Sequence, residues 1–385
     1  MAAEYYFSSN APELSFWQKL LHFNWPLLIL LCVTGAVGVA MLYSAANGSW
    51  TPWATRQLAR FSFSVLLLFA VGLTDIRIWL RFAYPIYVVA LALLVAVELI
   101  GATGMGAQRW ISLGVFNLQP SEVMKIASVL ALARYFHSAT LEDVGRPLYL
   151  IIPVAMILGP AALVLKQPDL GTAIMLIAAG GAVLFAVGVR LWNFTLVLVA
   201  GLGAMPVVWS TLRPYQQRRI YTFLDPESDP LGAGYHILQS KIALGSGGLF
   251  GKGFMKGTQS HLNFLPEKQT DFIFTMLAEE FGLAGGLGLL ALYMLLIVYG
   301  FAISLRSRNQ FGRILGIGLT VTVSLYVFIN VAMVMGLVPV VGVPLPLISY
   351  GGTAMLSVMI AFGLLISISI HRDTLIGRHG ETENF

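Results

Sequence analysis

The stretch NFLPEKQTDFIFTMLAEEFG, residues 263–282, changes from charged to apolar within a few residues. Glu267, Lys268 and Asp271 stand at its start, and the apolar run that follows is long enough to cross a membrane as a helix. The stretch therefore predicts a carboxylate, Asp271, where a loop enters a membrane span. We expect Thr270 as the N-cap and Asp271 in the first helical turn, where oriented N–H groups favour an anion. An acid that only caps the helix is the competing interpretation.

The composition assigns the chain to the helical membrane proteins. Of its 385 residues, 57% are hydrophobic and only 11% are charged, whereas about a quarter of an ordinary soluble domain is charged. The apolar runs are continuous and do not alternate, which argues against a β-barrel. Cys32 is the single cysteine, so an intrachain disulfide or a cysteine metal site is excluded. The first apolar run, near Trp25, has spanning length and is expected to remain as an anchor.

Ten runs of spanning length predict an all-α, polytopic integral membrane protein with ten transmembrane helices, which we treat as one domain over residues 1–385. The runs are approximately 25–45, 54–74, 79–100, 119–137, 148–166, 169–189, 191–209, 271–304, 311–338 and 344–370. The segments on the side of the termini carry eleven Lys and Arg residues, against four in the short loops opposite. By the positive-inside rule, both termini and the tail of residues 371–385 are cytoplasmic.

The loop of residues 210–270, between helices 7 and 8, then faces the extracytoplasmic side. It mixes several lysines and arginines, among them Arg213 and Lys268, with aromatic residues. Cations there suit either an anionic partner at the membrane surface or the head groups of anionic lipids, and the aromatic residues favour a segment folded on that surface. The glycine-rich stretch GSGGLFGKG, residues 245–253, lacks the spacing of a nucleotide-binding loop. Tight turns or close backbone approach explain its glycines better.

Further ionisable residues stand at the outer starts of two other spans. Glu122 and Lys125 are three residues apart, so they share one face of a helix and can pair. Asp169 begins the sixth span. Charges inside a membrane are costly and commonly mark function, but a structural ion-pair network between helices is an equally good interpretation. Glu279 and Glu280 should lie deeper in the eighth span and serve helix packing.

The loop VPVVGVPLPLISYGGTA, residues 338–354, places proline and glycine at membrane depth. Non-helical backbone at this depth must be buried in protein or line a cavity. Ser349 and Tyr350 therefore face a ligand path, unless the segment is a plain re-entrant turn; the two interpretations stay open. Histidine and acidic residues are too scattered to predict a transition-metal site, so any metal ligands remain unknown.

Six stretches carry a resemblance to a known family. They are GAQRWISLG (106–114), QPSEVMKI (119–126), KQPDLGTA (166–173), FLDPESDPLGAGYHILQSKIALGSGGLFGKG (223–253), GTQSHLNFLPEKQTDFIF (257–274) and PLPLISYGG (344–352). Together they resemble the SEDS family (shape, elongation, division and sporulation), most closely its RodA branch, over about residues 20–375. The resemblance implies a peptidoglycan glycosyltransferase of the cytoplasmic (inner) membrane that polymerises lipid II at the outer leaflet for cell elongation and cell shape.

The resemblance also implies a partner and site residues. The partner would be a class B penicillin-binding protein that supplies transpeptidation; membrane lipids surround the chain, and no nucleic acid is implied. The essential carboxylate falls on Asp271, and Glu122, Lys125 and Asp169 belong to the central site.

The chemistry of such a site can be reasoned from its residues. Attack by a sugar 4-hydroxyl needs a general base, for which we propose Asp271. One carboxylate with a phosphate leaving group predicts an inverting reaction. The resemblance implies that this reaction forms a β-1,4 bond and releases undecaprenyl pyrophosphate. Lys125, Arg109, Arg213 and loop lysines such as Lys268 are candidates to stabilise the pyrophosphate, with Mg²⁺ or Mn²⁺ sharing that task. The alternatives are a lipid II flippase and a scaffold that recruits a synthase.

Overall fold

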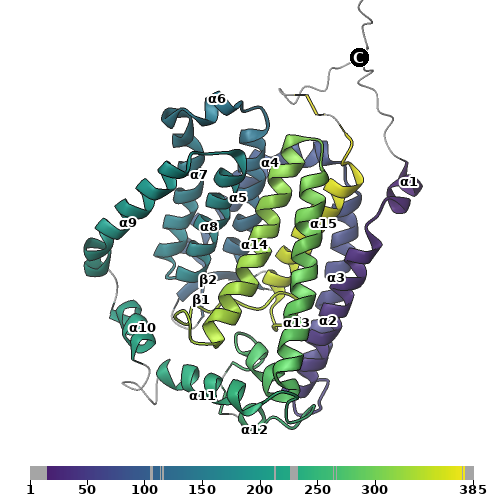
Figure 1. Ribbon diagram of the computed structural model, residues 1–385, viewed down its shortest axis with the longest axis vertical. Coiled ribbons are helices and arrows are strands. Elements are labelled where there is room, and N and C mark those ends of the chain that lie inside the picture. Colours follow the sequence, from purple (N-terminus) through teal and green to yellow (C-terminus); the bar gives the residue numbers. More distant parts are fainter. Residues whose placement is uncertain are drawn as a thin grey trace, which may run out of the picture.

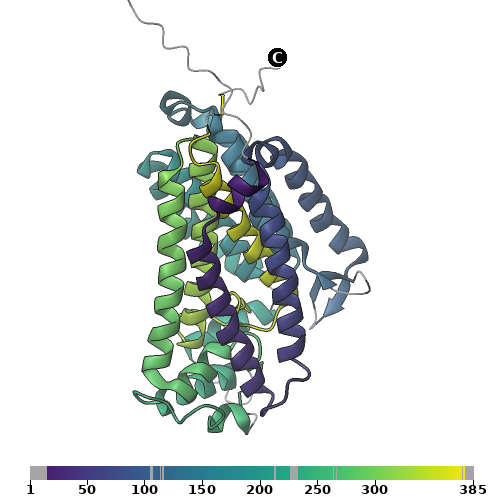
Figure 2. The same cartoon turned by 90° about the vertical axis from the view of Figure 1, so that its right-hand side faces the viewer.

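The computed structural model of the protein describes residues 15–104, 107–112, 114, 117–211, 214–225, 233–262, 264–265, 267–374 and 376–377. Ten long helices run roughly along the long axis of the molecule (Figures 1 and 2). They are α2 (Trp25–Ala45), α3 (Ala54–Leu73), α4 (Ile76–Ile100), α5 (Pro120–His137), α7 (Pro147–Lys166), α8 (Leu170–Val187), α9 (Leu191–Thr211), α13 (Ile273–Arg306), α14 (Gln310–Val334) and α15 (Gly352–Ile370). Each overlaps one of the ten predicted spans.

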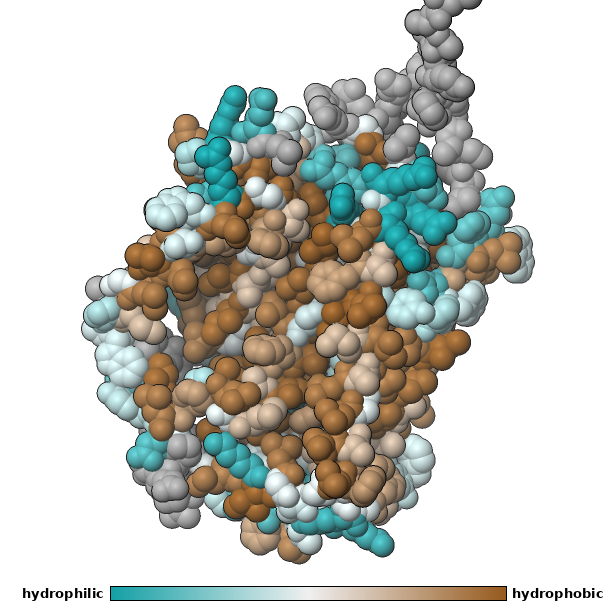
Figure 3. All heavy atoms as spheres, viewed as in Figure 1, coloured by the Kyte–Doolittle hydropathy of each residue, from teal (hydrophilic) through white to brown (hydrophobic). Residues whose placement is uncertain are grey.

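The surface confirms a multi-pass membrane protein. Figure 3 shows a continuous hydrophobic belt around the middle of the visible face, with hydrophilic residues gathered toward the two ends. Within the described residues, eight helices are long and apolar enough to cross a membrane. The two further helices are α5, which carries Glu122, Lys125 and Arg134, and α9, whose apolar part is Leu191–Pro206. The charges lower the apolar character of α5, and α9 is apolar over the part whose side chains the structure describes.

The last span begins later than predicted. Residues 344–351 are not helical, and α15 starts only at Gly352. Pro344 and Pro346 lack the N–H that a helix interior needs, and each disfavours helical geometry in the residue before it. The loop before α15 therefore stays non-helical inside the protein, with turns and bends over residues 346–350, and it becomes part of the site described below.

Shorter elements connect the spans. Helices α1 (Phe16–Leu21) and α6 (Leu141–Val144) lie toward one end of the bundle, whereas α12 (Thr258–His261) lies at the opposite end (Figure 1). The predicted outer loop of residues 210–270 contains α12 together with α10 (Pro214–Leu224) and α11 (Ala233–Ser246). We refer to the end of the bundle at which α12 lies as the α12 end.

A small antiparallel sheet adds to the helical fold. Strands β1 (Ala102–Gly104), β2 (Ala107–Ser112) and β3 (Asn117–Leu118) form a meander between α4 and α5, at the edge of the bundle in Figure 2. The prediction did not include it, because β1 and β3 are short and the six residues of β2, AQRWIS, do not alternate between apolar and polar. The sheet contains Arg109, which it places beside the α7–α8 turn.

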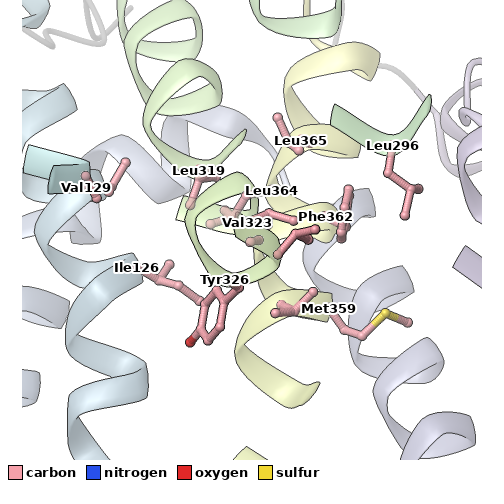
Figure 4. Packing of buried hydrophobic residues seen from close by; sticks show 14 of the residues in the cluster. Ile126, Val129, Leu296, Leu319, Val323, Tyr326, Met359, Phe362, Leu364 and Leu365 are labelled. Atoms are coloured by element: carbon pink, nitrogen blue, oxygen red, sulfur yellow. The ribbon is translucent and has the colours of Figure 1, made fainter. Parts of the chain in front are cut away.

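Helix α14 lies in the middle of the apolar core. Figure 4 shows Leu319, Val323 and Tyr326 of α14 between side chains of α5 and α15. On the other side of α15, α3 packs along its length. With α13 also in contact with α14 and α15, the side chains of α14 have fixed surroundings on several sides.

Candidate functional site

A buried ion pair links α5 to α14. Lys125 Nζ lies 2.8 Å from Glu122 Oε1, and the two side chains are 2% and 4% exposed. The Tyr326 hydroxyl donates a hydrogen bond to the other carboxylate oxygen, Glu122 Oε2, and Lys125 Nζ lies 4.0 Å from the centre of the Tyr326 ring. Figure 4 shows the Tyr326 hydroxyl pointing away from the labelled apolar side chains. Because burying charges is costly unless they are paired and hydrogen-bonded, this arrangement lowers the cost of keeping them inside the membrane.

Asp169 lies at the start of α8, as the N-cap residue. Its Oδ1 accepts a bond from the Thr172 N–H at 3.2 Å, and its Oδ2 accepts one from Gln119 Nε2 at 3.3 Å. Gln119 precedes α5, so Asp169 joins the outer starts of α5 and α8. Arg109 stabilises the same turn from the sheet: its guanidinium donates to the main-chain carbonyls of Gln167, at 3.1 Å, and Pro168.

Asp271 lies in a turn just before α13, which corrects the predicted cap. The N-cap position of α13 is Phe272, and Asp271 precedes the helix. The Thr270 hydroxyl does not cap the helix; it donates to Glu267, to the main-chain carbonyl at 3.2 Å and to Oε2 at 3.0 Å. The prediction failed because the chain makes a further turn after Thr270 before the helical geometry begins.

The loop before α15 holds the Asp271 turn from one side. The Ser349 hydroxyl donates to the Thr270 carbonyl at 2.6 Å, and the Tyr350 N–H donates to the Gln269 carbonyl at 2.8 Å. Asp271 Oδ2 lies 3.4 Å from the position that a Cβ would take on Gly342. Gly342 has φ +73°, in the left-handed region that favours glycine. The loop thus approaches both the backbone and the carboxylate of the Asp271 turn.

Helix α13 is broken at Gly282, where φ is 68° and ψ is −163°. A Cβ on Gly286 would lie 3.6 Å from the ring of Phe274. In a straight helix these two residues are about 18 Å apart along the axis, beyond the reach of a phenylalanine. Residues 273–281 therefore fold back beside residues 283–290 as a re-entrant half-helix. Asp271 lies just before the first residue of this half-helix, at the end away from the break at Gly282.

The fold-back corrects the positions expected for Glu279 and Glu280, which lie at the α12 end. Glu279 accepts bonds from Lys252 Nζ at 2.8 Å, the Ser260 hydroxyl at 2.7 Å and the Gln259 N–H at 2.9 Å. Glu280 accepts a bond from the Ser44 hydroxyl at 2.5 Å, and His261 Nε2 lies 3.0 Å away. Both carboxylates attach the outer loop to α13 instead of packing helices deep in the bundle.

The glycine-rich stretch of residues 245–253 pairs with the break in α13. The N–H groups of Lys252 and Gly253 donate to the carbonyls of Glu279 and Glu280 at 3.1 and 2.9 Å, and the Leu283 N–H donates to the Gly248 carbonyl at 2.9 Å. These bonds replace helical bonds that the break removes. A Cβ on Gly251 would lie 2.1 Å from the Glu280 carbonyl oxygen. Close backbone approach, one of the two explanations for the glycines, is confirmed here.

Lys268 lies in the same turn as Asp271 and is 6% exposed. Its Nζ donates to the Ser260 carbonyl at 2.8 Å, which connects the turn to α12. Burial lowers the pKa of Lys268 from its ordinary value, because desolvation disfavours the charged form. Arg213, also proposed for the site, falls outside the described residues.

Helix α14 and the loop before α15 bring the separate charges into one region. Tyr326 contacts Glu122, and one turn further along α14 the Asn330 Nδ2 donates to the main-chain carbonyls of Asp271 and Val343, at 2.9 and 2.8 Å. A Cβ on Gly171, two residues after Asp169, would lie 3.0 Å from the Val343 side chain. Glu122, Lys125, Asp169 and Asp271 therefore border one polar region inside the membrane protein.

The sequence reasoning missed Tyr326 and Asn330. The available signal was the spacing of two polar side chains four residues apart in an apolar span, which places them on one helix face. For a metal, no group of three or more His, Cys, Asp or Glu side chains comes together in the part of the chain that the structure describes. Mg²⁺ is nevertheless often held by one or two carboxylates plus substrate phosphates, a mode compatible with the separate carboxylates here.

Fold and site together define a polytopic membrane protein with a buried, charged region beside a broken helix, α13. Comparison with known proteins then gives the family: the model of the FtsW/RodA/SpoVE family, described as "Cell cycle protein", matches residues 18–374, and the chain belongs to that family.

Individual relatives agree. The "Peptidoglycan glycosyltransferase MrdB" of Escherichia coli K12 is 44% identical over 373 residues, covering 96% of this chain and 99% of the relative. The "Stage V sporulation protein E" of Bacillus subtilis is 34% identical and covers 89% of this chain and 96% of the relative.

Two solved structures share the fold. One comes from work on polymerization and crosslinking by a peptidoglycan synthase complex, with a TM-score of 0.80, 31% identity and coverage of 91% of this chain and 98% of that chain. The other is the crystal structure of the rod shape determining protein RodA of Thermus thermophilus, with a TM-score of 0.69, 28% identity and coverage of 91% and 97%.

Proposed function

We propose that this chain polymerises lipid II into glycan strands, with Asp271 as the general base. The class of activity follows from the relatives: the chain is a peptidoglycan glycosyltransferase of the RodA type, similar to MrdB over 96% of its length. The observation that carries the residue assignment is the Asp271 turn. It is held by Ser349 and Asn330 just before the half-helix, beside the buried Glu122–Lys125 pair. A carboxylate on a backbone turn held in this way is suited to accept a proton in a fixed geometry.

The reaction is a single displacement. The 4-hydroxyl of the acceptor sugar forms a bond to the anomeric carbon of the donor, and its proton passes to the Asp271 carboxylate. The bond from that carbon to the pyrophosphate breaks, and undecaprenyl pyrophosphate leaves with the electron pair. One carboxylate without a covalent intermediate inverts the anomeric centre and gives a β-1,4 linkage.

The remaining predicted residues take supporting roles in the proposal. Lys125 supplies positive charge near the leaving group, and Glu122 keeps it oriented. Asp169 and Arg109 hold the outer starts of α5 and α8 in place. Ser349 supports the Asp271 turn, Lys268 joins it to α12, and Arg213 is a further candidate for pyrophosphate binding. A divalent metal, Mg²⁺ or Mn²⁺, would add positive charge at the pyrophosphate.

The proposal includes a setting and a partner. The chain lies in the cytoplasmic (inner) membrane with both termini cytoplasmic, so the α12 end and the site face the extracytoplasmic side. The structural relative with a TM-score of 0.80 comes from work on a peptidoglycan synthase complex. This supports a class B penicillin-binding protein as the partner that crosslinks the new strands.

The test uses the protein purified with its class B partner and supplied with labelled lipid II and Mg²⁺. Asp271→Ala and Asp271→Asn are expected to abolish polymer formation at matched complex yield. The control Asp143→Asn, in α6 at the opposite end of the bundle, should polymerise like the wild type. Polymer formation by both Asp271 variants would refute the base assignment, and chelation by EDTA tests the metal in the same assay.

The same preparation separates the alternative functions. A lipid II flippase would move labelled lipid II across liposomes without forming polymer. A scaffold would support the partner equally well with and without Asp271. Polymer that depends on Asp271 argues against both.

A further inference from the structure

Asn330 makes two hydrogen bonds, and one of them holds the Asp271 turn. It lies on α14 with 0% of its surface exposed. Its Nδ2 donates to the carbonyl of Asp271 at 2.9 Å and to the carbonyl of Val343 at 2.8 Å. One amide group thus joins two segments that are far apart in the sequence: the turn before α13 and the loop before α15.

An asparagine suits this position for chemical reasons. Two main-chain carbonyls need two donors, and a neutral NH₂ group supplies both from one atom. A lysine would bury a charge, and an aspartate would place a carboxylate against two carbonyl oxygens, which is unfavourable without water. Because the contact is to the main chain, Asn330 fixes where residue 271 lies without bonding to its carboxylate through this amide.

Helix α14 connects the Glu122–Lys125 pair with the Asp271 turn. Tyr326, one helical turn before Asn330, donates to Glu122. Both residues belong to a helix packed against α5, α8, α13 and α15. A single rigid helix therefore sets the distance between the Glu122–Lys125 pair and the Asp271 turn.

We propose that Asn330 is a positioning residue that holds Asp271 at its working distance from the reacting sugars. The proposal rests on the proposed role of Asp271 as the base. When the amide is removed, the turn loses the bond that connects it to α14 while its carboxylate remains. A displacement of about 1 Å at a reacting group can lower the rate about 100-fold.

The test compares Asn330→Ala and Asn330→Ser with Asn309→Ala. Asn309 is a matched control because it is a buried asparagine of the same helix: it is 4% exposed and caps the other end of α14 by accepting the Gly312 N–H at 2.6 Å. Its loss should lower stability without touching the Asp271 turn. The measured quantities are kcat and KM for labelled lipid II, with the class B partner present, and the thermal stability of each variant.

A positioning role predicts that kcat falls while KM stays nearly unchanged. Asn330→Ala should lower kcat about 10- to 100-fold while KM stays within about 3-fold. Asn330→Ser keeps one donor, so its kcat should lie between the kcat of Asn330→Ala and that of the wild type. Asn309→Ala should keep kcat within about 3-fold even where it loses as much thermal stability.

Several outcomes would overturn the proposal. A kcat for Asn330→Ala equal to that of Asn309→Ala would show that the amide serves stability alone, and a rise in KM at constant kcat would show substrate binding instead. If Asn330→Ala does not fold, the test rests on Asn330→Ser. A kcat of Asn330→Ser equal to that of the wild type refutes the positioning role. An active Asp271→Asn variant refutes the base itself, whereas an inactive one with normal Asn330 variants refutes only the positioning role.

Discussion

At the scale of single residues, the buried charge on α5 depends on three side chains: Glu122, Lys125 and Tyr326. Glu122 and Lys125 could be paired by their spacing, and they do pair. The donor that completes the arrangement, Tyr326, comes from a helix about 200 residues away in the chain. The same holds for Asn330, whose two contacts belong to other segments. Predicting a charged region was possible from single residues, whereas predicting its hydrogen bonds was not.

Replacing Tyr326 by phenylalanine tests the contribution of its hydroxyl. The ring and its contact with Lys125 remain, but the buried Glu122 Oε2 loses a donor. We expect the free energy of unfolding to fall by about 1–3 kcal/mol, because a buried acceptor is left unsatisfied. Thermal denaturation in detergent measures the change. Tyr299→Phe is the control, since the described residues contain no side-chain hydrogen bond of Tyr299, and an equal loss in both variants would contradict the expectation.

At the scale of elements, the break in α13 depends on the glycine-rich stretch. The backbone of Gly251 lies close to Glu280 and Gly282. Main-chain hydrogen bonds join Lys252 and Gly253 to Glu279 and Glu280, so the two segments stabilise each other's shape. The hydrophobicity of residues 271–304 predicts one long span, and a local pattern carries no sign of a fold-back. Only the glycines at Gly251 and Gly282, both with positive φ, hinted at unusual backbone there.

Gly251→Ala should therefore destabilise the protein. Its φ is +80°, and the new Cβ would lie 2.1 Å from the Glu280 carbonyl oxygen. Backbone strain and crowding together predict a loss of roughly 2–4 kcal/mol in the free energy of unfolding. Gly245→Ala, in α11 with open space around its Cβ, is the control and should be neutral or slightly stabilising. Equal melting temperatures of the two variants would argue against the fold-back as described.

At the scale of the whole molecule, orientation in the membrane follows from the distribution of charge. Since Cys32 is the single cysteine, a Cys32→Ala background allows one new cysteine at a time. We expect Lys256→Cys, in the exposed loop at the α12 end, to react with a membrane-impermeant thiol reagent added outside intact spheroplasts. Arg308→Cys, between α13 and α14 at the opposite end, should react only after permeabilisation. The reverse pattern would invert the proposed topology and move the site to the cytoplasmic side.

The sequence by itself determined the ten spans and the charged residues that they carry. Spanning length is a property of consecutive residues, and an ion in an apolar run is visible wherever it stands. The tertiary structure decided the rest: the strands around Arg109, the fold-back at Gly282, and the bonds of Tyr326 and Asn330. Each of these depends on a partner from a distant segment, and in a protein interior every buried polar group must find such a partner or remain costly. That requirement acts only after the helices have packed together.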